Sequence, residues 1–128
     1  MDVGAGECQF FQHLTERGWH GVYRPIDAVI DGTDLEGWAP SFDVHWIVCI
    51  ETVEHLRFPW RLIDVMIRRA HHGVILTTPN AESVDVIACD PTHVSIVHAG
   101  DLTRAGFTVE RHSWFGVPED SLLAWRRA

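Results

Sequence analysis

Residues 42–56 read FDVHWIVCIETVEHL, and this stretch decides the fold. Its first part, residues 42–50, is a nearly continuous apolar run, which is typical of a strand buried on both faces of a parallel sheet. The polar residues Glu51, Glu54 and His55 follow at once, so they stand where this strand ends. Because ligands bind such sheets outside the carboxyl ends of the strands, these three residues are the first candidates for chemistry.

The rest of the chain alternates strands and helices around this strand. Before it, the pattern predicts a strand ending at Val3, a helix over 8–17, a strand over 21–26 and a short strand near Val29. After it come a helix that starts near Pro59 and ends by Gly73, a strand over 74–78, a helix over 101–105, and strands over 107–114 and 121–125. This alternation predicts an α/β fold, a three-layer sandwich around a Rossmann-like, mostly parallel sheet.

Length and composition bound the kind of protein. The chain has 128 residues, of which 46% are hydrophobic, which suits one domain with its own core over residues 1–128. No apolar run is long enough to span a membrane, no signal peptide is visible, and the three cysteines are widely spaced, so we expect a cytoplasmic protein. The net charge of −8 disfavours nucleic acid as a partner, because nucleic acid needs a basic surface.

A glycine motif, DVGAG, fills residues 2–6 at the end of the first strand. Glycines in a strand-to-helix turn allow a ligand to approach the backbone closely. A dinucleotide-binding turn has a third glycine three residues after the second, and here that position is Gln9. A nicotinamide-dependent oxidoreductase is therefore the less favoured alternative. The acidic Asp2, two residues before Gly4, suits a ligand that carries an ammonium group.

Asp27 closes the second strand, 21 residues after Gly6. An acid at about this spacing accepts hydrogen bonds from ribose hydroxyls in nucleotide-binding sheets. The alternative is an aspartate that only shapes a turn.

Three motifs in this order resemble the class I S-adenosylmethionine-dependent methyltransferases: acid-x-Gly-x-Gly at residues 2–6, the stretch 42–56 with its Glu-x-x-Glu-His-Leu end, and Thr-Thr-Pro-Asn at residues 77–80. The resemblance implies a mostly parallel sheet whose last strand is antiparallel, and S-adenosylmethionine as the cofactor. The family usually has a helix between its second and third strands. Only residues 28–30 separate Asp27 from Asp31, so that helix must be absent or reduced to a turn.

The resemblance also implies a cofactor site. Asp27 would hold the ribose, and the pair Asp34-Leu35 would meet the adenine. The full set of expected cofactor-binding residues is Asp2, Gly4, Gly6, Asp27, Asp34, Leu35, Ile50 and Glu51.

A metal site is a further expectation. If helical geometry has begun by Glu51, spacings of three and four place Glu51, Glu54 and His55 on one helix face, where they can ligate a divalent metal. Two methyltransferase subfamilies use Glu-x-x-Glu-His in this way, and one adds a downstream histidine, for which His93 is the candidate. The resemblance thus implies magnesium or manganese on Glu51, Glu54, His55 and His93. The alternative is that Glu54 complements the helix dipole and His55 lines the pocket.

The expected activity is methyl transfer to an acceptor, most simply a small molecule, with His55 as the first candidate for a general base and His93 as the second. The alternative is a domain that binds S-adenosylmethionine without activity and serves as a partner or regulatory subunit. The glycine motif starts at residue 2, so we expect a cofactor-covering cap that is short or missing. Either the chain is a truncated or very compact family member, or a partner supplies the lid, and a homodimer or a partner subunit is possible.

Overall fold

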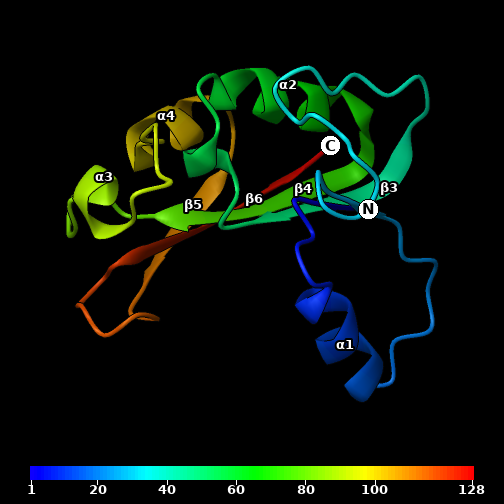
Figure 1. Ribbon diagram of the computed structural model, residues 1–128, viewed down its shortest axis with the longest axis horizontal. Coiled ribbons are helices and arrows are strands. Elements are labelled where there is room, and N and C mark those ends of the chain that lie inside the picture. Colours follow the sequence, from blue (N-terminus) through cyan, green and yellow to red (C-terminus); the bar gives the residue numbers. More distant parts are fainter.

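The structure, a computed structural model that describes residues 1–128, contains a six-stranded sheet with helices beside it (Figure 1). The strands are β1 (Asp2–Val3), β2 (Pro25–Ile26), β3 (Val44–Ile50), β4 (Ala70–Pro79), β5 (Thr108–His112) and β6 (Ser121–Arg127). The helices are α1 (Gln9–Glu16), the 3₁₀ turn η1 (Val53–His55), α2 (Pro59–Arg69), α3 (Val86–Cys89) and α4 (Ala99–Arg104).

The sheet has the order β2-β1-β3-β4-β6-β5. Strands β2, β1, β3 and β4 pair in parallel, whereas β6 is antiparallel to both of its neighbours, β4 and β5. This confirms the Rossmann-like, mostly parallel sheet with an antiparallel last strand. The carboxyl ends of β1, β3 and β4 therefore lie at one edge, and the start of β6 lies beside them.

The core lies between the sheet and the helices α2 and α4, which cover the same face of the sheet (Figure 1). Helix α2 forms because Pro59 occupies its first turn, where no amide hydrogen bond is lost, and Arg68 and Arg69 complement the dipole at its end. Its apolar side chains Ile63 and Met66 are fully buried. No helix is long and apolar enough to cross a membrane.

The opposite face of the sheet carries only α1, which extends away from it (Figure 1). None of the eight residues of α1 is buried. The second helical layer that the three-layer prediction requires is thus a single short helix.

The strand predicted near Val29 is wrong. Val29 lies in a turn and is 91% exposed. The Asp27 carboxylate accepts the amide hydrogen of Val29, and the Asp31 carboxylate accepts that of Thr33, so polar side chains hold this segment as turns. The preceding strand is also shorter than predicted and covers only Pro25–Ile26. The sheet accordingly has six strands.

Gly73 permits the close pairing of β4 with its neighbours. A Cβ atom there would lie 2.4 Å from the carbonyl oxygen of Arg126 and 2.6 Å from the Trp46 ring. We expect Gly73→Ala to lower the free energy of unfolding by about 1–3 kcal/mol, the usual cost of overpacking, in chemical denaturation. The control is Gly37→Ala, where the nearest atom is 3.8 Å away and stability should hold or rise slightly. Equal effects of the two substitutions would contradict this packing argument.

Candidate functional site

A cavity of about 470 Å³ opens at the edge where β3 and β4 end. Residues from four segments line it, namely Glu51, Glu54 and His55 after β3, Pro79 and Val84 after β4, Cys89, Asp90 and His93 around the end of α3, and Phe115, Val117 and Asp120 between β5 and β6. The position agrees with the general rule that ligands bind parallel sheets outside their carboxyl ends. It brings together His55 and His93, the two histidines predicted from the sequence.

The carboxylate of Glu54 forms the floor of this cavity. Glu54 lies in η1 and its residue surface is 0% exposed. The Thr78 hydroxyl donates a hydrogen bond of 3.1 Å to Oε2, but Oε1 is buried and has no partner. Burial raises the pKa of this carboxyl above its usual range. An unpaired buried oxygen is costly, so its retention points to a bound group.

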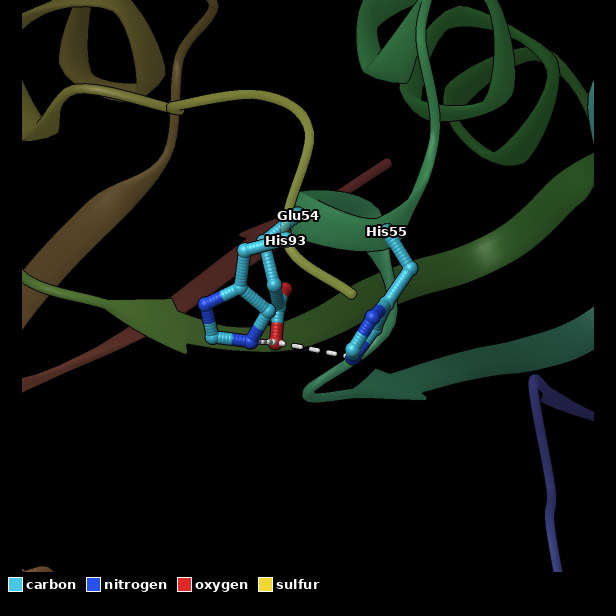
Figure 2. A group of neighbouring side chains, drawn as sticks. All are labelled: Glu54, His55 and His93. Atoms are coloured by element: carbon cyan, nitrogen blue, oxygen red, sulfur yellow. Dashed lines mark ion pairs between the residues drawn. The ribbon is translucent and has the colours of Figure 1, made fainter. Parts of the chain in front are cut away.

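Two imidazoles face the unpaired oxygen, as Figure 2 shows. The Nε2 atoms of His55 and His93 lie 3.9 and 4.0 Å from Glu54 Oε1. These separations are too long for hydrogen bonds. One ligand atom from each of the three residues lies within 4.8 Å of the others, a spacing that leaves room for an ion between them.

The other nitrogen of each ring is held by the protein. His93 Nδ1 lies 2.7 Å from the carbonyl oxygen of Val86, an acceptor only, so Nδ1 carries the proton. His55 Nδ1 lies 3.0 Å from the Thr92 hydroxyl oxygen and 3.3 Å from the Thr92 carbonyl oxygen. Proton donation from Nδ1 leaves the Nε2 lone pair of each neutral ring free to bind a metal or accept a proton.

Glu51 lies beside this cluster but outside the group of three ligand atoms. Its backbone is left-handed, with φ of 46°, and helical geometry begins only at Val53, so the prediction that Glu51 shares a helix face with Glu54 and His55 is wrong. Its amide donates to both the carbonyl and the hydroxyl oxygen of Thr77, which holds it at the end of β3. That Glu51 binds metal or cofactor stays a prediction.

Glu51 also has an unusual pKa. Its Oε1 is buried without a hydrogen-bond partner. Burial, reinforced by the nearby carboxylate of Glu54, raises its pKa to about 7.

The glycine motif forms the turn between β1 and α1. The amide of Gly6 donates a 3.0 Å hydrogen bond to the Asp27 carboxylate, which ties this turn to the end of β2. A Cβ at Gly4 would lie 2.2 Å from the Thr52 hydroxyl, so Gly4 permits packing against the protein itself. At Gly6 nothing lies within 4 Å of an added Cβ, so this glycine faces open space.

The remaining predicted cofactor residues lie on β1, at the end of β3 and in the segment between β2 and β3. Asp2 is 3% exposed, accepts a hydrogen bond from the Tyr23 hydroxyl, and has its pKa raised by burial. Ile50 ends β3. Asp34 and Leu35 lie between β2 and β3, where Leu35 packs against the core. The contacts of these residues with a cofactor stay predictions.

Sequence reasoning missed several residues that build the cavity. Thr92 orients His55, and Asp120 holds the loop before β6 by accepting amide hydrogens from Trp114, Phe115 and Val117. In this region the sequence pattern indicated only the turn around Gly116 and Pro118. Nothing in it indicated that this turn would reach residues 51–55, more than 60 positions earlier in the chain.

Comparison with known proteins identifies the fold. No family model matches the sequence, and neither does any curated protein. Among solved structures, the chain is similar to an S-adenosylmethionine-dependent methyltransferase from Archaeoglobus fulgidus, with 14% identity, a TM-score of 0.69, and coverage of 99% of this chain and 84% of the other. It is also similar to the N-terminal domain of EvdMO1, which has S-adenosylhomocysteine bound, with 15% identity, a TM-score of 0.66, and coverage of 99% and 73%.

A third similar structure is the magnesium protoporphyrin IX methyltransferase from Synechocystis with bound S-adenosylmethionine, with 12% identity, a TM-score of 0.53, and coverage of 98% and 68%. The fold is therefore that of the class I S-adenosylmethionine-dependent methyltransferases, as the sequence motifs predicted. Identities this low establish the fold alone.

The raised pKa of Glu51 predicts a pH dependence of stability. The folded state binds this proton up to about pH 7, whereas the unfolded chain releases it near 4.5, so Glu51 makes the protein less stable as pH rises between these values. Glu51→Gln should therefore gain stability relative to the parent across this window, by about 1–3 kcal/mol after allowance for partial exposure. Urea denaturation at several pH values measures this difference. Glu16→Gln on exposed α1 is the control and should leave the pH dependence of stability unchanged. If the stability of Glu51→Gln changed with pH in the same way as that of the parent, the raised pKa of Glu51 would be contradicted.

Proposed function

We propose that this protein is an S-adenosylmethionine-dependent methyltransferase that acts on a small molecule bound in the 470 Å³ cavity. One observation carries the proposal. The glycine turn with Asp27 and the cavity with Glu54 lie at the same edge of the sheet, and residues 50–52 join them. Thr52 contacts the glycine turn, with its hydroxyl 3.5 Å from the carbonyl oxygen of Gly4, while Glu51 lines the cavity.

This arrangement suits direct methyl transfer. The cofactor would lie over the turn after β1, with Asp27 as the acceptor of hydrogen bonds from its ribose. The acceptor molecule would enter from the cavity side and meet the sulfonium methyl group near Glu51. The protein then contributes orientation and exclusion of water, and needs no covalent intermediate. The Nε2 atom of His55 is the first candidate to take a proton from the acceptor, and that of His93 is the second.

The cavity supports a small acceptor. Its volume lies within the usual range for small-molecule sites, roughly 300–1,000 Å³. Its lining mixes apolar side chains, including Val84 and Phe115, with the acids and imidazoles described above. The net charge of −8 gives no support for nucleic acid as the acceptor. No feature of the structure favours the alternative of a domain without activity.

We further propose that a divalent metal binds between Glu54, His55 and His93. The fit rests on the unpaired Oε1 of Glu54 and on the Nε2 atoms of His55 and His93, which lie 3.9 and 4.0 Å from it. Bound there, a metal would lower the pKa of an acceptor hydroxyl. Carboxylate ligation suits magnesium or manganese, and the two imidazoles tilt the choice toward manganese.

The cofactor assignment predicts that an added side chain at Gly6 blocks binding. Asparagine adopts the left-handed backbone of Gly6, where φ is 50°, more readily than most residues, so Gly6→Asn should fold. It should weaken binding of S-adenosylhomocysteine by at least about tenfold in calorimetry, which corresponds to about 1.4 kcal/mol. The matched control is Gly18→Asn, also left-handed and facing open space, at the end of α1. Unchanged affinity in Gly6→Asn would reject the assignment.

The metal assignment predicts manganese binding that depends on His93. Electron paramagnetic resonance should show that the wild-type protein binds Mn²⁺. His93→Ala removes a ligand and should weaken Mn²⁺ binding by at least about tenfold, the smallest loss seen when only an outer-shell partner is removed. His13→Ala, on exposed α1, should bind as the wild type does. Methyl transfer should stop in excess chelator and return with manganese. A wild-type protein that does not bind Mn²⁺ would overturn the metal site and leave the methyltransferase proposal intact.

A further inference from the structure

A groove of about 1070 Å³ lies between α1 and the sheet face opposite the core. Apolar side chains line both of its walls, with Phe10 and Leu14 on α1 and Trp46, Val48 and Ile75 on the sheet. Val48 pairs with Ile75 in register, and Ile75 pairs with Trp125, so an apolar row crosses three adjacent strands on this face. Such a row is usually covered by a layer of helices.

Helix α1 is too small to cover this face. A sheet of six strands is about 24 Å wide at a spacing of about 4.8 Å between strands. A helix is about 10 Å in diameter, and the eight residues of α1 extend about 12 Å. Even if α1 moved fully onto its own sheet, part of the apolar row would stay in contact with water.

The total surface area is larger than that of a compact monomer of the same mass. The chain exposes 7495 Å², whereas a compact monomer of 14.5 kDa exposes about 6900 Å². The excess is about 600 Å² per chain, or about 1200 Å² for two chains, which reaches the lower end of the range for specific protein interfaces.

The charges in the groove do not oppose association. The chain carries a net charge of −8, but the charged residues of the groove are two acids, one arginine and two histidines. Of the acids, Asp2 is buried, and Asp43 lies 3.1 Å from the Arg69 guanidinium. The groove is thus close to neutral on an acidic protein, so two copies can meet here with little repulsion.

We propose that a second copy of this chain docks on this face, related by a twofold axis, with the two α1 helices side by side between the two sheets. Each chain carries both halves of the contact, a helix with no buried residue and a sheet face without a full helical layer. A surface that contains both complementary parts is what a twofold interface requires. The pair of α1 helices would place two helices between the two sheets, so that each sheet face is covered by more than its own α1.

Sedimentation velocity of the wild-type chain, from micromolar to millimolar concentration, tests the proposal. We expect a species of twice the 14.5 kDa chain mass. Phe10→Glu and, separately, Leu14→Glu place a charge in the groove and should each shift the equilibrium to monomer. Neither residue belongs to the buried core, and circular dichroism would confirm folding. Phe58→Glu, at a 55% exposed phenylalanine beside α2, is the matched control and should stay dimeric.

A chain that sediments as a monomer at every concentration would overturn the proposal. So would a dimer that persists in both groove variants, because the interface would then lie elsewhere. The outcome does not depend on methyl transfer, since mass is measured without cofactor or acceptor.

Discussion

The pairing of β3 with β4 is the contact on which both the core and the site depend. Its register places Ile50 opposite Thr77, so the amide of Glu51 donates to Thr77 and the Thr78 hydroxyl reaches Glu54. The same two strands present Ile47 and Leu76 to the core. A slip of one residue would turn every side chain of β3 to the opposite face. The position of the site therefore depends on the same strand register that forms the core.

This register allows a buried carboxylate to be kept at the strand end. Burying a charge with one unpaired oxygen costs several kcal/mol, and the raised pKa values of Glu51 and Glu54 express that cost. The Thr78 hydroxyl donates to the Glu54 carboxylate and holds the side chain in place. The Glu54 carbonyl accepts amide hydrogens from Val94 and Ser95, and these bonds hold the backbone. The cluster of Glu54, His55 and His93 is thus held in place before any ligand arrives, and binding a cation would relieve part of the cost.

The sequence predicted those parts that local patterns determine. The apolar run 42–50 became β3 with its start moved to Val44, and the helices at residues 9–16 and 59–69 lie where periodicity placed them. His93 was placed beside His55 only by resemblance, because no local pattern links residues 38 positions apart. Thr92 and Phe115 reach the cavity through tertiary packing, which single-sequence patterns do not encode. Val29 was misjudged because the three apolar residues 28–30 between Asp27 and Asp31 suggest a strand, yet the carboxylates favour turns.

The two faces of the sheet serve different purposes. On the covered face, α2 and α4 pack over the core that contains β3 and β4, and Glu54 stands in η1, which follows β3 after two residues. On the other face, α1 is joined to β1 by a turn in which Gly4, Gly6 and Cys8 all have left-handed backbones. That turn is also the predicted cofactor turn, and only two residues separate Gly6 from the first residue of α1. Covering this face would therefore act on the cofactor turn, while the acid and imidazole cluster, anchored by the core, would keep its geometry.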